Sequence, residues 1–143
     1  MTKASLDLWA PRMLGVLRII AALLFIQHGM QKLFHFPPGG HNVGAFDPLS
    51  FKGIAGLLEF GGGLLVAVGL FTRLASFLLS GEMAVGYFLI HVPLGATMDW
   101  GVLPVVNQGD LAILFCFVFL YFVFAGPGAW SLDMIYQRRA PAE

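Results

Sequence analysis

Four long stretches of the chain are apolar, and shorter segments rich in glycine, proline or charged residues separate them. These stretches cover residues 13–34, 53–70, 74–92 and 107–125. A transmembrane helix needs about 20 consecutive, mostly apolar residues, whereas helices of soluble proteins are usually shorter and apolar on one face only. The pattern therefore predicts an all-α, polytopic membrane protein in which four spanning helices form a bundle, with residues 1–143 as a single domain.

The start of the chain looks partly like a secretory signal peptide, because Lys3 and Arg12 precede the first apolar stretch. A signal peptide has an apolar run of only about 7–15 residues and ends at small residues. This stretch is longer and ends in His28-Gly29-Met30-Gln31-Lys32. We therefore expect a retained first span, preceded by a short segment that lies along the membrane surface.

The cationic residues outside the spans predict the orientation in the membrane. With four spans, one side receives most of these residues: Lys3, Arg12, Arg73, Arg138 and Arg139. Cytoplasmic loops and ends of membrane proteins are enriched in Lys and Arg. Both termini are therefore predicted to be cytoplasmic, and the loops 36–52 and 93–106 to face outward.

The composition narrows the function classes. Of the 143 residues, 58% are hydrophobic and only 11% are charged, against about 25% charged in ordinary soluble domains. The numbers exclude a free-standing soluble enzyme and a disordered chain. Eight Lys and Arg balance eight Asp and Glu, so no positive field exists to bind nucleic acid. The single cysteine, Cys116, cannot form a disulfide within the chain or an iron–sulfur site, and no dinucleotide-binding or phosphate-binding fingerprint is present.

The ionisable side chains inside or near the ends of the apolar stretches are the candidates for function. An Arg, Lys or Asp at the centre of a spanning helix costs about 2.5–3.5 kcal/mol, so these residues are expected to be paired or solvated inside the bundle. Those of the first span fall within an arc of about 80° on a helical wheel, which predicts one polar stripe. The candidates are Arg18, His28 and Lys32 in the first span, Glu59 in the second, Glu82 and His91 in the third, and Asp110 in the fourth.

Two interpretations of these residues remain open. In the first, they are buried ion pairs that fix the helix register, and Arg18 reaches Glu82 or, with an extended side chain, Glu59. In the second, they line a polar pocket that binds a small redox molecule or relays protons, with Glu59 and His28 as the catalytic candidates. A haem held between His28 and His91 is geometrically conceivable but not favoured, because most paired histidines in membranes are not haem ligands, and no metal site is expected.

Several short sequence fragments occur in a defined order along the chain. They are His28-Gly29-Met30-Gln31-Lys32-Leu33-Phe34, Gly53-Ile54-Ala55-Gly56-Leu57-Leu58-Glu59, Glu82-Met83-Ala84, and Gly126-Pro127-Gly128-Ala129-Trp130-Ser131-Leu132-Asp133. In order and spacing, these fragments resemble the DoxX family over nearly the whole chain. Asp110 stands where the family pattern leads us to expect a glutamate.

The resemblance implies a multi-pass protein of the bacterial or archaeal inner membrane. Characterised branches of the family include the membrane subunit of a thiosulfate:quinone oxidoreductase and a component of a membrane complex with superoxide dismutase and a sulfurtransferase. A quinone or similar small molecule is thus the implied ligand, with no covalently bound cofactor. The implied partners are membrane lipid and a second redox protein, since the thiosulfate branch depends on a separate subunit and catalysis by this chain alone is not expected.

Together these observations predict a membrane subunit that binds a quinone in the outer half of the bundle. His28 and Lys32 are expected to contact its head group, Glu59 to handle protons, and Arg18 with Glu82 to hold the scaffold. The expected ligand-binding set is Arg18, Lys32, Glu82, His91 and Asp110. The alternatives are a non-catalytic scaffold or assembly subunit and, less favoured because no inverted repeat is evident, a carrier of small solutes or protons.

Overall fold

The computed structural model describes residues 2–38 and 47–139, and within this part of the chain all regular structure is helical. The all-α prediction is therefore confirmed. The elements are α1 (Lys3–Phe34), α2 (Phe51–Val68), α3 (Thr72–Gly86), the π-helical turn η1 (Tyr87–His91), α4 (Val92–Gly95), α5 (Asp110–Ala125) and α6 (Leu132–Arg139).

Three helical segments are long and apolar enough to cross a membrane: α1, α2, and the continuous run α3-η1-α4 over Thr72–Gly95. The fourth predicted span, 107–125, begins later in the structure, because α5 starts at Asp110 and has 16 residues. At 1.5 Å per residue this helix is about 24 Å long, somewhat less than the hydrocarbon thickness of about 30 Å. Three spans are thus supported by length, and the fourth remains a prediction.

The helix ends differ from the sequence prediction in three places. The predicted N-terminal surface segment forms the beginning of α1, whose first turn is capped by the Thr2 side chain, and its place along the membrane surface stays a prediction. The third helix continues past its predicted end at residue 92, because Pro93 follows the π-helical turn η1, where the backbone bonds do not follow the i→i−4 pattern that proline interrupts. The C-terminal tail, expected to be irregular, contains α6.

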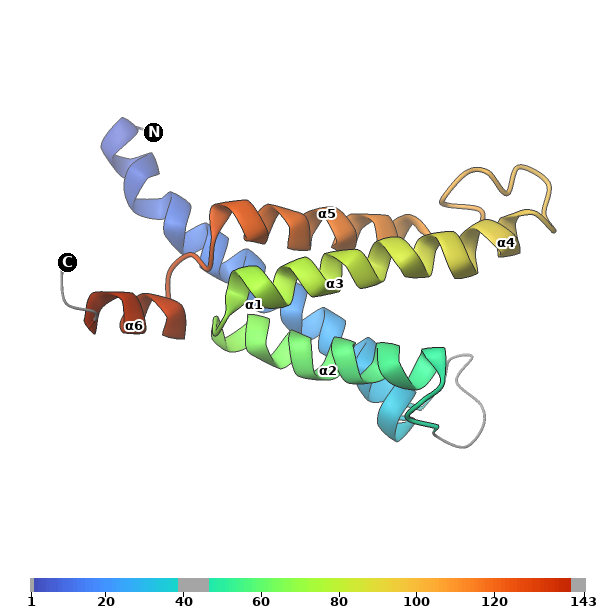
Figure 1. Ribbon diagram of the computed structural model, residues 1–143. Coiled ribbons are helices and arrows are strands. Elements are labelled where there is room, and N and C mark those ends of the chain that lie inside the picture. Colours follow the sequence, from blue (N-terminus) through green and yellow to red (C-terminus); the bar gives the residue numbers. More distant parts are fainter. Residues whose placement is uncertain (1, 39–46, 140–143) are drawn as a thin grey trace.

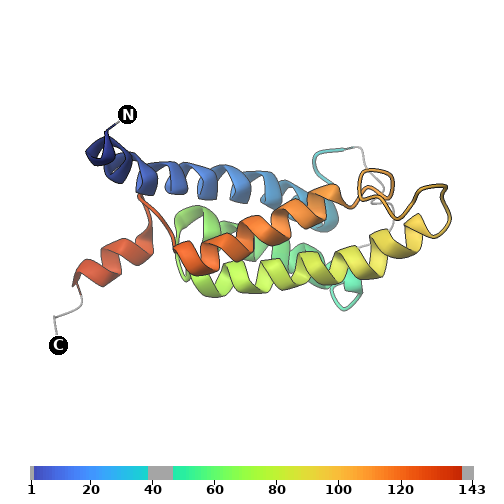
Figure 2. The same ribbon diagram turned by 90° about the horizontal axis from the view of Figure 1, so that it is seen from above.

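The helices form two antiparallel pairs, α1 with α2 and α3 with α5 (Figure 1). The pairs lie close together at the end that carries both termini and diverge toward the opposite end. The connections from α1 to α2 and from α4 to α5 are both at this opposite end (Figure 2). The start of α1 and helix α6 thus lie at the same end of the bundle, and the cytoplasmic location of both termini stays a prediction.

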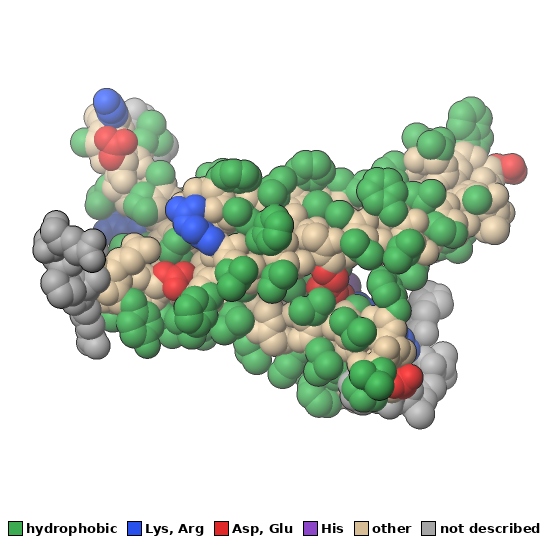
Figure 3. Space-filling view, in the orientation of Figure 1, with side chains coloured by type: hydrophobic (Ala, Val, Ile, Leu, Met, Phe, Trp, Pro, Cys, Tyr) green, Lys and Arg blue, Asp and Glu red, His purple; other side chains and the backbone are tan. Residues whose placement is uncertain are grey.

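The core fills the space between the pairs, and the outer sides are apolar. Phe25, Val66, Leu79 and Phe119 are at most 1% exposed, and the rings of Phe25 and Phe119 meet edge to face at 4.8 Å. Large apolar side chains are also exposed along all the long helices, as the space-filling view shows (Figure 3). Soluble monomers rarely expose such continuous apolar surface, so lipid is the expected neighbour.

The α1–α2 pair depends on glycine at Gly29. A Cβ atom added there would lie 2.5 Å from the backbone nitrogen of Phe60 and 3.0 Å from the carbonyl oxygen of Gly56. Backbone atoms cannot turn aside as a side chain can, so any larger residue must push the two helices apart. Small residues at helix contacts are how membrane proteins bring backbones this close.

We therefore expect Gly29→Ala to lower the free energy of unfolding in detergent by about 1–3 kcal/mol, the usual cost of overpacking. Gly61→Ala on α2 is the matched control, because a Cβ there meets nothing within 4 Å. Thermal unfolding of the two purified variants measures the difference. Equal stability of both would contradict the close contact at Gly29.

Candidate functional site

Arg18 lies at the termini end of the bundle and is completely buried. Its guanidinium donates to the carbonyl oxygens of Val66 and Ala67, both at 2.6 Å, in the last turn of α2. It also donates to Pro127 O at 2.7 Å and Trp130 O at 2.8 Å, in the segment between α5 and α6. The last carbonyls of a helix have no partner within the helix and carry partial negative charge. The predicted pairing of Arg18 with Glu82 or Glu59 is therefore wrong, because backbone oxygens take all the contacts given for its guanidinium.

A cavity of about 470 Å³ opens where the two helix pairs diverge. Acidic and histidine side chains are visible in this hollow in the space-filling view (Figure 3). All four long helices contribute to its wall. The lining residues are Phe25, His28 and Lys32 of α1; Phe51, Lys52, Ala55 and Glu59 of α2; Glu82, Met83 and Gly86 of α3; Ile90 and His91 of η1; Gln108; and Leu111, Ala112 and Phe115 of α5.

The cavity wall holds an ion pair between α1 and α2. The Lys32 ammonium donates to one carboxylate oxygen of Glu59. The Glu59 side chain is only 3% exposed and that of Lys32 is 23% exposed, so the pair is buried from the carboxylate side. The second Glu59 oxygen, Oε2, is buried and has no hydrogen-bond partner among the described residues.

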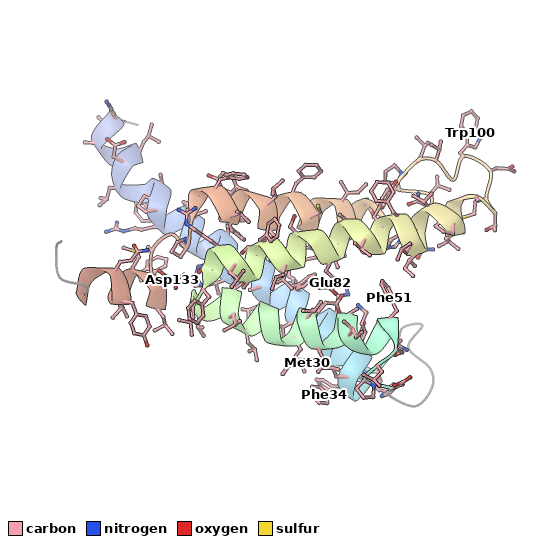
Figure 4. The ribbon with its side chains drawn as sticks, viewed as in Figure 1. Met30, Phe34, Phe51, Glu82, Trp100 and Asp133 are labelled. Carbon is pink, nitrogen blue, oxygen red and sulfur yellow. The ribbon has the colours of Figure 1, made fainter. Side chains whose placement is uncertain are left out.

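Glu82 faces this pair from α3. Figure 4 shows its side chain on the side of α3 that is turned toward α1 and α2. Both carboxyl oxygens are buried, and within the described part of the chain neither has a hydrogen-bond partner. Glu82 lies within electrostatic range of Glu59 and Lys32. Buried polar groups are nearly always hydrogen-bonded, so an unpartnered carboxyl group on a cavity wall indicates a place for a ligand or solvent.

The two histidines of the cavity occupy different surroundings. His28 is partly buried, with its ring edge-on to Phe115 at a centroid distance of 6.3 Å. His91 Nδ1 lies 3.0 Å from the carbonyl oxygen of Asn107. Because a carbonyl can only accept, Nδ1 carries the proton and Nε2 is the acceptor of the neutral ring.

The structure thus brings together five of the residues selected from the sequence, namely His28, Lys32, Glu59, Glu82 and His91. The other two lie elsewhere. Arg18 is at the far end of the bundle, and Asp110 is an exposed residue at the start of α5 that does not line the cavity. Neither has the position expected of a ligand-binding residue of this cavity.

Sequence reasoning missed several cavity residues. Phe51 and Lys52 fall at the end of the predicted loop 36–52, and Gln108 falls at the start of the predicted span 107–125, so none of them is among the candidates from the sequence. Lys52 and Gln108 add hydrogen-bond donors, and Phe25, Phe51 and Phe115 add flat apolar surface. The signal available was position for three of them: Phe51 and Lys52 begin α2, and Gln108 lies two residues before α5. An apolar wall with a few polar groups is the usual form of a small-molecule site.

The comparisons with known proteins bear on this site. The sequence model of one family, described as DoxX, matches residues 13–92, more than half of the chain. The chain belongs to the DoxX family. All five cavity residues selected from the sequence lie inside the matched segment, whereas α5 lies outside it.

Relatives of this DoxX protein are named as membrane proteins or carry no functional name. An uncharacterized protein of Haemophilus influenzae is 43% identical over 131 residues, covering 90% of this chain and 94% of its own. An uncharacterized membrane protein of Mycobacterium tuberculosis is 30% identical, covering 88% and 82%. Inner membrane protein YqjF of Escherichia coli is 29% identical, covering 87% and 92%. No solved structure matches the chain.

Proposed function

We propose that this DoxX protein is an inner-membrane subunit of a redox system that binds the head group of a quinone in the cavity between its helix pairs. The observation that carries the proposal is the unpartnered carboxyl group of Glu82 beside the Lys32–Glu59 ion pair. These groups lie in an apolar bundle, where an ionisable residue with no partner indicates a functional site.

The cavity has the chemistry that a quinone head group requires. Its volume of about 470 Å³ lies within the range of about 300–1,000 Å³ typical of small-ligand sites. Phenylalanine rings on α1, α2 and α5 offer flat surfaces to a flat ring. A bound quinone supplies a pair of ring oxygens that take up two electrons and two protons. His28 and Lys52 can donate hydrogen bonds to such oxygens, and the carboxyl groups of Glu59 and Glu82 can hold protons beside them.

In this proposal a partner oxidoreductase exchanges electrons with the quinone. The chain contains one cysteine, Cys116, and no dinucleotide-binding fingerprint, so its sequence offers no second redox group of its own. The exposed apolar sides of the helices provide contact with lipid, and a quinone dissolved in the bilayer reaches the cavity from there. In this proposal the chain positions the quinone and its protons, and the partner exchanges electrons with it.

A cavity-filling variant tests the proposal without removing any charged group. A Cβ at Gly86, which lines the cavity, and one at Gly81, an exposed residue of α3, each meet nothing within 4 Å. We expect Gly86→Phe to weaken binding of decylubiquinone by about tenfold or more, the loss of about 1.4 kcal/mol of binding free energy. Gly81→Phe, its matched control, should bind as the unmodified protein does. Equilibrium dialysis against the purified protein in detergent measures both.

The scaffold alternative is favoured by one observation, the buried Arg18 of α1, whose guanidinium donates to backbone oxygens of α2 and of the α5–α6 segment and so joins the three. Purification from the native membrane in mild detergent separates the two functions. A stable partner recovered with no bound quinone, and no binding of decylubiquinone by the purified chain, would favour the scaffold. Bound quinone that is lost in Gly86→Phe would favour the redox subunit.

A further inference from the structure

The hydrogen-bonding groups of the cavity wall favour one redox form of the ligand, a point that rests on the proposed function. Three buried carboxyl oxygens in the cavity wall lack hydrogen-bond partners among the described residues: Glu59 Oε2, Glu82 Oε1 and Glu82 Oε2. The ammonium of Lys32 is already engaged by the other oxygen of Glu59. Around Glu82 the wall is therefore rich in acceptors that are not satisfied.

From this arrangement we propose that the cavity binds the hydroxyl-bearing, reduced form of a quinone more tightly than the oxidised form, with a ring hydroxyl placed against Glu82. A quinone oxygen can only accept hydrogen bonds, whereas a quinol hydroxyl both donates and accepts. The ligand class is thus a flat ring that carries at least one hydroxyl group.

The preference holds for either protonation state of Glu82. If the carboxyl group is ionised, it only accepts, so a hydroxyl pairs with it while a ring carbonyl faces it without a proton between them. If it is protonated, its O–H can donate to either ligand, but only a hydroxyl can also donate back to the remaining carboxyl oxygen. In both states the quinol satisfies one more buried oxygen than the quinone does.

The other polar residues of the cavity do not remove the preference for the quinol over the quinone. His91 Nδ1 donates to the Asn107 carbonyl, so Nε2 is the ring nitrogen left for a ligand, and a hydroxyl can pair with it whether Nε2 accepts or donates. His28, Lys52 and Gln108 can donate to a ligand oxygen, and a hydroxyl oxygen accepts such bonds as a carbonyl does. A buried acceptor left without a partner is unfavourable by an amount equivalent to about tenfold or more in affinity.

The experiment compares two probes, decylubiquinol and decylubiquinone, by equilibrium dialysis against the purified full-length protein in detergent under anaerobic conditions. We expect the quinol to have a Kd about tenfold lower than the quinone. Glu82→Leu keeps a similar side-chain volume and removes both oxygens, so the ratio of the two Kd values should fall to about one. Asp7→Leu, which replaces an exposed acidic residue at the far end of α1, is the control and should keep the preference.

The outcomes separate this inference from the function on which it rests. Equal Kd values for the two probes, tighter binding of the quinone, or a preference unchanged in Glu82→Leu would overturn the inference while leaving quinone binding in place. Failure of both probes to bind the unmodified protein would overturn the proposed function as well. If Glu82→Leu does not fold, Glu82→Gln provides the second variant: its amide has a fixed donor and acceptor, as a protonated acid has, so the preference should persist. Its loss in a folded Glu82→Gln protein would count against the proposed contact.

Discussion

Replacing Arg18 by methionine is expected to lower the free energy of unfolding by about 3–5 kcal/mol, since hydrogen bonds to a charged donor are worth about 1.5–3 kcal/mol each and at least two are lost. The guanidinium donates to five carbonyl oxygens on two separate segments. Methionine fills similar space but donates nothing, so the carbonyls lose the guanidinium as their donor, although Val66 O keeps the backbone N–H of Gly69 at 3.1 Å. Inside a bilayer there is no water to replace the lost donor.

Unfolding of the purified variant by heat or by denaturing detergent measures this loss. Arg12→Met is the matched control on the same helix, because Arg12 is partly exposed and its guanidinium lies over the ring of Trp9, 5.1 Å from the ring centroid. Its expected cost is below about 1 kcal/mol. Arg18→Lys should recover little stability. The three N–H groups of a lysine ammonium share one nitrogen atom, so they cannot reach the carbonyls of both segments as the planar guanidinium does. A loss no larger than that of Arg12→Met would contradict the role given to Arg18.

Arg18 also shows where prediction from the sequence stops. Its burial on the inner side of α1 follows from the cost of exposing a cation to lipid, and the structure agrees. Its partners do not follow, because a sequence displays charged side chains but not the unpaired carbonyls at the end of a helix. The choice between Glu82 and the end of α2 depends on where α2 ends and how the α5–α6 segment folds back. Neither is visible before the chain is folded.

The positions of the long helices could be predicted from the sequence, but their exact ends could not. Long apolar stretches determine where helices lie, so α2 begins and ends within two residues of the stretch 53–70. Helix ends depend on local chemistry that hydropathy does not measure, and α3-η1-α4 therefore runs three residues beyond the predicted end at residue 92, to Gly95. Hydropathy did not predict the polar helix α6, because it contains no apolar stretch.

The cavity residues were predictable in part, because antiparallel packing brings together ionisable positions of different helices. His28, Lys32 and His91 lie toward the end of the bundle opposite the termini, and Glu59 and Glu82 lie near the middle of α2 and of the run α3-η1-α4. Asp110 has a similar depth but lies on the exposed side of α5. Depth can be counted along the sequence, whereas the rotation of each helix about its own axis is set by contacts between helices.

Breaking the ion pair between Lys32 and Glu59 is expected to cause the second large loss of unfolding free energy. Lys32→Met leaves the Glu59 carboxylate buried and without a cation, which should cost about 3–5 kcal/mol of unfolding free energy. Glu59→Leu leaves Lys32 unpaired, but that side chain is 23% exposed and can move toward the membrane surface. Its loss should therefore be smaller, about 1–3 kcal/mol.

The double variant Lys32→Met/Glu59→Leu decides whether the pair is needed for stability or for the ligand. Replacing a whole buried ion pair by apolar residues is often neutral or stabilising, so the double variant should be more stable than Lys32→Met alone. The four unfolding free energies give a coupling energy, expected to lie at about 2–3 kcal/mol for residues in direct contact. If the pair serves only packing, the double variant binds decylubiquinone as the unmodified protein does. If it serves the cavity, stability recovers while binding is lost, because the double variant has neither the ammonium of Lys32 nor the carboxyl group of Glu59 to offer the ligand. A coupling energy near zero would show that the two side chains do not act on each other in the membrane-embedded protein.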